Sequence, residues 1–213
     1  MSGDGSLVLD GVTVALDGAT LIAGLDLAVA PGEIVTVMGP SGSGKSTLLA
    51  WLCGAADPAF RIAGRAVLDG VDITRLPPEA RRVGILFQDD LLFPHLSVGG
   101  NLGFGLPAGL GRAAREARIE AALEEAELPG FAGRDPATLS GGQRARIALM
   151  RTLLAAPKAL LLDEPFSRLD AALRDRIRCF VFGHATERGL PVLLVTHDPD
   201  DARAAGGPVV EIG

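Results

Sequence analysis

The sequence predicts an α/β fold with a parallel sheet as its core, and three observations support this. First, continuous apolar runs lie at 34–38, 159–163 and 191–196. Runs of this kind are typical of parallel strands that are covered on both faces. Second, helical segments lie between and around the runs. Third, each run ends at a glycine or at a polar side chain. We therefore expect functional groups at the carboxyl ends of the strands.

Four further apolar stretches have the length of strands, at 7–16, 21–30, 62–68 and 209–212. The pair Asp17-Gly18 lies between the first two, and such a pair is a strong hairpin signal. We expect these two stretches to be antiparallel strands and the third to join them. An antiparallel β flank beside the parallel sheet is therefore predicted, and the fourth stretch is expected to be a short last strand.

One motif follows the first parallel run, namely Gly39-Pro40-Ser41-Gly42-Ser43-Gly44-Lys45-Ser46-Thr47. It fits the pattern of a glycine, four residues, and Gly-Lys-Ser/Thr, and a helix is expected after it over 45–53. Gly42 and Gly44 would let backbone N–H groups surround a phosphate at the positive end of that helix. Lys45 would reach the β and γ phosphates, and Ser46 would ligate Mg²⁺. We expect a P-loop NTPase with a RecA-like core; the alternative is a Gly-Ser turn that happens to precede a lysine.

The middle of the chain has a different character. A strand at 83–87 ends at Gln88, and after it come an apolar loop at 91–96 and a charged, alanine-rich helix at 112–128. We expect this part to be an inserted helical subdomain. The expected division is a single domain over 1–213, with the α/β core and its β flank at 1–88 and 157–213 and the helical subdomain at 89–156.

Composition excludes several classes of function. The net charge is -6, so nucleic acid is not an expected partner. Cys53 and Cys179 stand far apart with no second pair, which indicates neither a disulfide framework nor a zinc site and fits a reducing compartment. The first five residues lack the apolar core of a secretory signal. No run of about 18 apolar residues occurs, so we do not expect the chain to span a membrane by itself.

A second motif, Leu139-Ser140-Gly141-Gly142-Gln143, opens a later helix. Ser140 and Gln143 form a capping box, which begins many ordinary helices, but the two glycines would also permit close approach of a phosphate. Here the chain resembles the ABC ATPases, whose signature motif is LSGGQ. The resemblance covers nearly the whole chain, because other family motifs occur in the family's order: Gln88 (Q-loop), 160–164 (Walker B and its glutamate), 167–170 (D-loop) and His197 (switch histidine).

The resemblance implies a role for each of these residues. Asp163 would hold Mg²⁺ together with Ser46 and Gln88. Glu164 would be the general base for the attacking water, and because a proline follows it we expect extended backbone there. His197 would contact the γ phosphate, while Gln88 would sense Mg²⁺ and the water. Besides the loop at 39–47, the nucleotide-binding residues that the family implies are Ser140, Gly141, Gly142, Gln143 and Asp170.

Family geometry further implies that two copies meet head to tail, so that ATP on the loop of one copy is capped by the signature motif of the other. Hydrolysis would then power a separate transmembrane permease. Because no membrane span, second motif set, long coiled coil or zinc cysteines occur, we expect a separate subunit of a bacterial-type transporter. Residues 135–138 lack the acidic-glycine pattern common in exporters, which favours an importer subunit, and the chain resembles the small YnjD-type proteins. A substrate-binding protein and a position on the cytoplasmic face of the bacterial inner membrane are expected with it. The cargo stays open.

Two rival functions remain open. One is a non-transport ABC ATPase that drives a membrane complex mechanically, of the division-associated type. The other is a P-loop kinase, for which the signature motif would be a coincidence. The expected permease-docking surface is apolar and consists of Leu91, Leu92, Phe93, Pro94, Leu96 and Trp51.

The chain departs from the family at one position. The family usually stacks an aromatic residue on adenine, and the matching residue here is Leu16. Stacking on a base is worth about 1–3 kcal/mol in nucleic-acid complexes. We therefore expect weaker ATP affinity or weaker discrimination against GTP.

Overall fold

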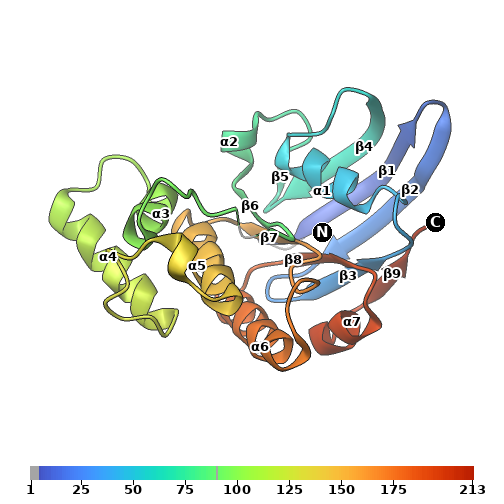
Figure 1. The fold of residues 1–213 in the computed structure, drawn as a ribbon. Coiled ribbons are helices and arrows are strands. Elements are labelled where there is room, and N and C mark those ends of the chain that lie inside the picture. Colours follow the sequence, from blue (N-terminus) through green and yellow to red (C-terminus); the bar gives the residue numbers. More distant parts are fainter. Residues whose placement is uncertain (1–4, 90) are drawn as a thin grey trace.

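The computed structural model describes residues 5–89 and 91–213 and contains two sheets with helices on several sides (Figure 1). The expectation of no secretory signal rested on the first five residues, and 1–4 lie outside the described part. Within that part, no helix is long and apolar enough to cross a membrane. The predicted combination of a parallel sheet and an antiparallel sheet is confirmed.

The parallel sheet has the strand order β6-β7-β8-β3-β9. Its strands are β3 (Ile34–Met38), β6 (Val83–Leu86), β7 (Ala159–Asp163), β8 (Val192–Thr196) and β9 (Val209–Glu211). Alternate side chains of β7 enter different cores: Leu160 and Leu162 pack toward α5 and α6, and Leu161 packs toward α1 and the second sheet. Burial on both faces explains the uninterrupted apolar runs. The strands share one direction, so their carboxyl ends meet at one edge.

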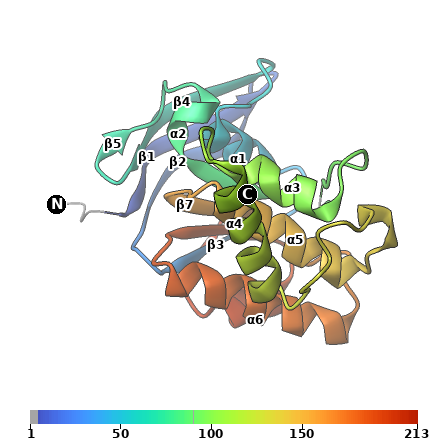
Figure 2. The ribbon, with the colours of Figure 1, turned by 90° about the vertical axis from the view of Figure 1, so that its left-hand side faces the viewer.

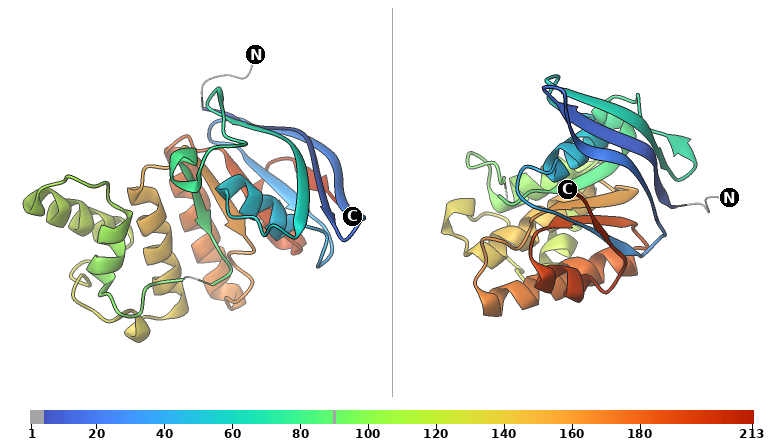
Figure 3. Two further views of the ribbon diagram at one scale, coloured as in Figure 1. Left: turned by 90° about the horizontal axis from the view of Figure 1, so that it is seen from above. Right: turned by 90° about the vertical axis from the view of Figure 1, so that its right-hand side faces the viewer.

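The antiparallel sheet has the order β2-β1-β4-β5. Its strands are β1 (Leu7–Leu16), β2 (Ala19–Val29), β4 (Phe60–Leu68) and β5 (Val71–Asp72). Asp17 and Gly18 have φ of +50° and +83°, as a two-residue hairpin turn requires. Helix α1 (Lys45–Cys53) lies between the two sheets (Figure 3). Strand β4 begins two residues earlier than predicted, and this places Phe60 opposite Leu16 in the β1–β4 ladder.

The remaining helices divide between the sheet and a projecting part. Helices α6 and α7 cover the face of the parallel sheet opposite α1, whereas α3 and α4 extend away from both sheets (Figures 1 and 2). Helix α5 packs between α3 and α6. The bounds are α2 (Pro78–Arg81), α3 (Val98–Gly105), α4 (Arg112–Glu125), a short 3₁₀ turn (Pro136–Thr138), α5 (Gly141–Leu154), α6 (Ala171–Glu187) and α7 (Pro199–Ala205).

Candidate nucleotide site

The loop between β3 and α1 has the geometry that an anion needs. Gly42 and Gly44 have φ of +83° and +90°, a region that side chains disfavour. Lys45 is only 6% exposed, and its Nζ donates to the carbonyl oxygens of Gly39 and Pro40, both at 2.7 Å. No described carboxylate forms an ion pair with Lys45. A buried cation that no carboxylate contacts directly is costly, so the site favours a bound anion.

Two further features of the loop concern its polar groups. The Ser43 hydroxyl is buried and has no hydrogen-bond partner among the described residues. Helix α1 begins at Gly44 without a side-chain cap, so the first N–H groups of the helix have no capping acceptor. A phosphate placed at this helix start would accept hydrogen bonds from these N–H groups. The Ser43 hydroxyl does not line the cavity beside the loop.

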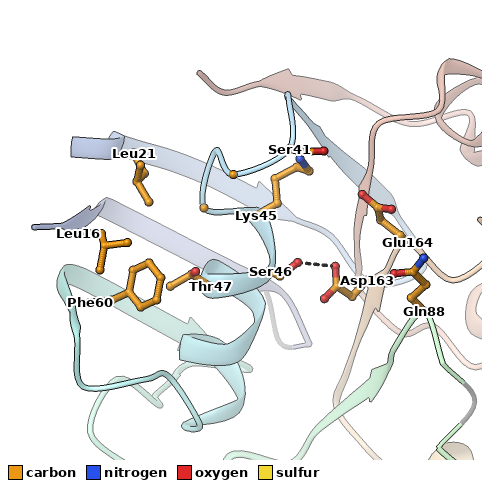
Figure 4. Close-up of a pocket in the computed structure, with 12 residues that line it drawn as sticks. Leu16, Leu21, Ser41, Lys45, Ser46, Thr47, Phe60, Gln88, Asp163 and Glu164 are labelled. Carbon is orange, nitrogen blue, oxygen red and sulfur yellow. Dashed lines mark hydrogen bonds between the residues drawn. The ribbon is translucent and has the colours of Figure 1, made fainter. Parts of the chain in front are cut away.

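A cavity of about 430 Å³ opens beside this loop. One end is polar and is formed by Gln88, Asp163 and Glu164, which follow the carboxyl ends of β6 and β7 (Figure 4). The other end is apolar and is formed by Leu16, Leu21 and Phe60 from the antiparallel sheet (Figure 4). Ser41, Gly42, Gly44, Lys45, Ser46 and Thr47 line the space between the two ends. The arrangement suits a ligand with a charged and an apolar end.

The predicted metal ligands are brought together at the polar end. The Ser46 hydroxyl donates to Asp163 Oδ1 at 3.0 Å, and Gln88 lines the same end of the cavity. The pKa of the Asp163 carboxyl is raised, mainly by burial and to a lesser degree by the negative charge of Glu164. The Ser46 hydrogen bond and the positive charge of Lys45 lower the pKa and offset only part of this rise. Among the described residues no group of three or more His, Cys, Asp or Glu side chains is placed to hold a metal alone. This donor set fits Mg²⁺, which takes one or two protein oxygens and completes its shell with phosphates and water.

The expectation of extended backbone at Glu164 is wrong, because its φ is +46°. Proline disfavours the right-handed helical region for the residue before it, but hydrogen bonds decide the conformation here. The Glu164 N–H donates to the Val195 carbonyl at 2.9 Å, and the Ser167 hydroxyl donates to the Glu164 carbonyl at 2.9 Å. Such a conformation costs about 1–3 kcal/mol and is concentrated at functional sites.

His197 lies beside this glutamate. Its Nδ1 is 2.9 Å from Glu164 Oε1, although the two residues are 33 positions apart. The imidazole is more than half exposed, and it does not itself line the nucleotide cavity. The structure thus brings the predicted base and the predicted switch histidine into direct contact.

A buried polar network anchors the turn that carries His197, and the sequence did not predict it. The Thr196 hydroxyl donates to Asp201 Oδ2 at 3.0 Å, and the Asp198 N–H donates to that hydroxyl at 3.0 Å. Arg178 of α6 donates through Nε to Asp201 Oδ1 at 2.6 Å. Arg178 and Asp201 are 6% and 2% exposed. This network fixes the end of β8 and hence the position of His197.

The signature residues lie elsewhere. The capping box at the start of α5 is confirmed: Ser140 Oγ accepts from the Gln143 N–H at 3.3 Å, and Gln143 Oε1 accepts from the Ser140 N–H at 2.9 Å. None of Ser140, Gly141, Gly142 and Gln143 lines the nucleotide cavity. Asp170 does not line it either; its carboxylate caps α6 by accepting from the Leu173 N–H at 3.0 Å. Within one copy, the phosphate loop and these residues therefore lie apart.

A second groove, of about 440 Å³, adjoins the polar end and shares Gln88 with it. Leu91, Leu92 and Pro94 line this groove, together with Gly141 at the start of α5. The expected docking residues are only partly placed there. Phe93 and Leu96 do not line the groove, and Trp51 is buried between the two sheets at 9% exposure, because it lies on the inner face of α1.

Sequence reasoning also missed Phe60 and Leu21 as cavity residues. The predicted third strand began at 62, so Phe60 was not placed in the ladder. Extending that strand by two residues would have put Phe60 opposite Leu16.

A scan of known families matches the ABC transporter family over residues 22–167. The chain belongs to the ABC transporter family. It is 51% identical over 198 residues to YnjD, an uncharacterized ABC transporter ATP-binding protein of Escherichia coli; the match covers 93% of this chain and 91% of YnjD. The Fe(3+) ions import ATP-binding protein FbpC 1 of Haemophilus influenzae is 41% identical over 99% of this chain. The chain spans 63% of the length of that iron-import protein.

Among solved structures, the chain is similar to the ATP-binding cassette MJ0796, determined as a dimer in a post-hydrolysis state with ADP and Pi. The TM-score is 0.78 at 31% identity, with 97% of this chain and 94% of that chain covered. These matches confirm the predicted P-loop NTPase fold, the resemblance to YnjD and the assignment as an ABC ATPase that binds ATP.

Proposed function

We propose that this ABC ATPase works as a head-to-tail dimer that closes on ATP and powers a membrane permease. One observation carries the proposal. The phosphate loop, Asp163 and Glu164 share a cavity that the signature residues do not line. Because an uncapped γ phosphate would face solvent, a second copy supplies the missing donors. MJ0796 was determined as a dimer, and this supports an assembly of two copies.

In the proposed dimer, Ser140 and the N–H groups at the start of α5 of one copy approach the γ phosphate on Lys45 of the other. The positive end of a helix there favours the anion by about 0.3–1 kcal/mol when exposed and by more when partly buried. Gly141 leaves room for the approach, because a β-carbon on it would meet nothing closer than 3.8 Å, and Gln143 holds the helix start through its capping bond. Asp170 contributes from the start of α6.

Within each site the chain's own groups divide the work. Mg²⁺, held by Ser46 and Asp163 with Gln88 nearby, would neutralise charge on the β and γ phosphate oxygens. Glu164 accepts a proton from the attacking water, a role typically worth about 10²- to 10⁴-fold in rate. His197 Nδ1 lies 2.9 Å from Glu164 Oε1, and this contact orients the carboxylate toward the attacking water. Lys45 and the loop N–H groups bind the β and γ phosphates.

We further propose that residues 89–156 form the helical signature subdomain, with the α/β core and β flank at 1–88 and 157–213. The groove that starts at Gln88 would receive an apolar helix of the permease on the cytoplasmic face of the inner membrane. Leu91 is the residue best placed for this contact, because it lines the groove and its side chain is 54% exposed. The iron-import relatives favour import over mechanical work. A substrate-binding protein is part of the same proposal.

The dimer is tested with the Glu164→Gln variant, which should bind ATP without hydrolysing it. Light scattering with ATP should give the mass of a dimer, and without nucleotide that of a monomer. The Lys45→Ala variant is the control and should stay monomeric with ATP. A Glu164→Gln monomer at saturating ATP would contradict the proposal and would favour a self-contained site of the kinase type.

The permease contact is tested by co-purification with the membrane subunit, compared between Leu91→Glu and Val71→Glu. Val71 lies on β5 and is 51% exposed, so the two substitutions carry a similar cost in stability. Only Leu91→Glu should release the permease. Retention by both variants would remove the groove from the interface, and a partner that transports nothing would favour the division-associated alternative.

A further inference from the structure

The apolar end of the nucleotide cavity contains an aromatic ring that the family pattern does not place there. Leu16, the residue at the usual aromatic position, ends β1 and lines this end. Phe60 begins β4 and lines the same end, and the two side chains lie next to each other (Figure 4). Phe60 is the one aromatic residue among those that line the described cavity.

Strand pairing explains why Phe60 can replace an aromatic residue on β1. Leu16 and Phe60 are directly opposite partners in the antiparallel β1–β4 ladder. Side chains of such partners lie on the same face of the sheet, with their β-carbons about 4.5–5.5 Å apart. A ring on Phe60 is therefore displaced from the usual ring by about one strand spacing, and it stays on the cavity side.

The backbone before Phe60 is fixed, so the ring is held in place. The Phe60 N–H donates to the Asp57 carbonyl at 3.1 Å, and the Asp57 carboxylate accepts from the Ala59 N–H at 2.9 Å. This turn sets the start of β4. The ring itself packs partly on the core between the two sheets and stays partly accessible from the cavity. A partly buried ring with one accessible side is suited to stacking.

We infer that Phe60 is the residue that stacks on the nucleotide base, in place of the absent aromatic residue at Leu16. A nucleotide with its phosphates on Lys45 and the α1 start must direct its base toward one end of the cavity. The polar end is occupied by the catalytic and metal-binding groups, so the base lies between Leu21 and Phe60 at the apolar end (Figure 4). This inference rests on the proposed nucleotide function.

The same end predicts little discrimination between purines. Its three side chains, Leu16, Leu21 and Phe60, offer no hydrogen bond to the edge of a base. Stacking itself tolerates every base, because each has a π face. We therefore still expect weak discrimination between ATP and GTP. With Phe60 stacked on the base, we no longer expect weakened affinity for ATP.

Calorimetric titration of the full chain with ADP, GDP and inorganic pyrophosphate tests the inference. Phe60→Ala and Phe60→Leu should weaken ADP and GDP binding to a similar degree, by roughly 5- to 150-fold, the range that base stacking covers. Pyrophosphate, which has no base, should bind all variants alike. Phe60→Tyr should keep the wild-type affinities. Phe104→Ala removes a 68% exposed ring on α3 and serves as the matched control without effect.

The Phe60→Leu variant separates stacking from packing, because leucine keeps the apolar contact with the core. In wild-type protein the adenine H2 and H8 resonances of bound ADP should shift upfield, and Phe60→Leu should abolish the shift. Wild-type affinity for ADP in Phe60→Leu, or ADP binding no tighter than pyrophosphate in the wild type, would overturn the inference. If the wild type bound neither ADP nor pyrophosphate, the proposed nucleotide function itself would be contradicted.

Discussion

The phosphate loop and the signature motif are both rich in glycine, but for different physical reasons. In the loop, Gly42 has φ of +83° and a β-carbon placed on it would meet nothing within 4 Å. At the start of α5, Gly142 has ordinary helical backbone, but its β-carbon would lie 2.6 Å from Leu173 Cδ1. The loop glycine serves conformation, and the signature glycine serves close packing of α5 on α6.

The two motifs also differ in completeness. The loop has its lysine, its helix start and two acidic neighbours within one cavity, whereas the signature residues open on another part of the surface. In the proposed dimer, the two motifs, which do not meet within one copy, meet between copies. Each of the following predictions would break or sharpen this contrast.

The largest effect is expected from the matched pair Ser140→Ala and Ser97→Ala. Both serines cap a helix through their side chains, at the starts of α5 and α3. Both substitutions should cost about 1 kcal/mol of stability in chemical denaturation. Only Ser140→Ala should lower ATP hydrolysis, roughly tenfold or more, because hydrogen bonds to charged groups are worth about 1.5–3 kcal/mol. Equal activity of the two variants would mean that Ser140 serves only as a cap.

A smaller effect is expected from Gly142→Ala. The added methyl group would overlap Leu173, and overpacking of this kind typically costs about 1–3 kcal/mol. The double variant with Leu173→Ala should regain part of that stability, as measured in urea. Leu173→Ala should not rescue Gly42→Ala, because the loss of stability in Gly42→Ala comes from the positive φ of this residue and not from a steric overlap. If the double variant were less stable than the sum of the single effects predicts, the packing role of Gly142 would be refuted.

The smallest expected change in stability concerns Asp163. Burial raises the pKa of its carboxyl in the folded protein, so ionisation destabilises the nucleotide-free state. The protonated Asp163 carboxyl contributes fully to stability below the pKa that it has in the unfolded chain. This contribution is lost as the pH rises through its higher pKa in the folded protein. Asp163→Asn should therefore raise the melting temperature of nucleotide-free protein at pH 7 and not at acidic pH, while hydrolysis is lost. A lower melting temperature at pH 7 would show that the Ser46 hydrogen bond outweighs burial.

Much of the site could be predicted because its chemistry is local. The loop at 39–47 places its groups within one contiguous run, and Asp163 and Thr196 end strands whose carboxyl ends share an edge. Phe60 could not be assigned, because its position depends on where β4 begins and on its register with β1. The Arg178–Asp201 pair could not be seen either, since its partners are 23 positions apart and meet only after α6 packs on α7.

The Glu164 conformation shows the same limit in another form. Proline gives a local preference, but the hydrogen bond to Val195 from a neighbouring strand overrides it. Local rules therefore predicted which residues are present at the site, and tertiary contacts determined how Glu164 is oriented.

The most direct test of a shared site is to mix two inactive variants. Lys45→Ala removes the phosphate lysine, and Ser140→Arg blocks the signature motif, so each alone should hydrolyse no ATP. In a mixed dimer, the intact loop of one copy faces the intact signature motif of the other. We predict that mixing restores ATP hydrolysis that neither variant has. If the mixture stays inactive although the two variants form dimers, the site is not shared between copies.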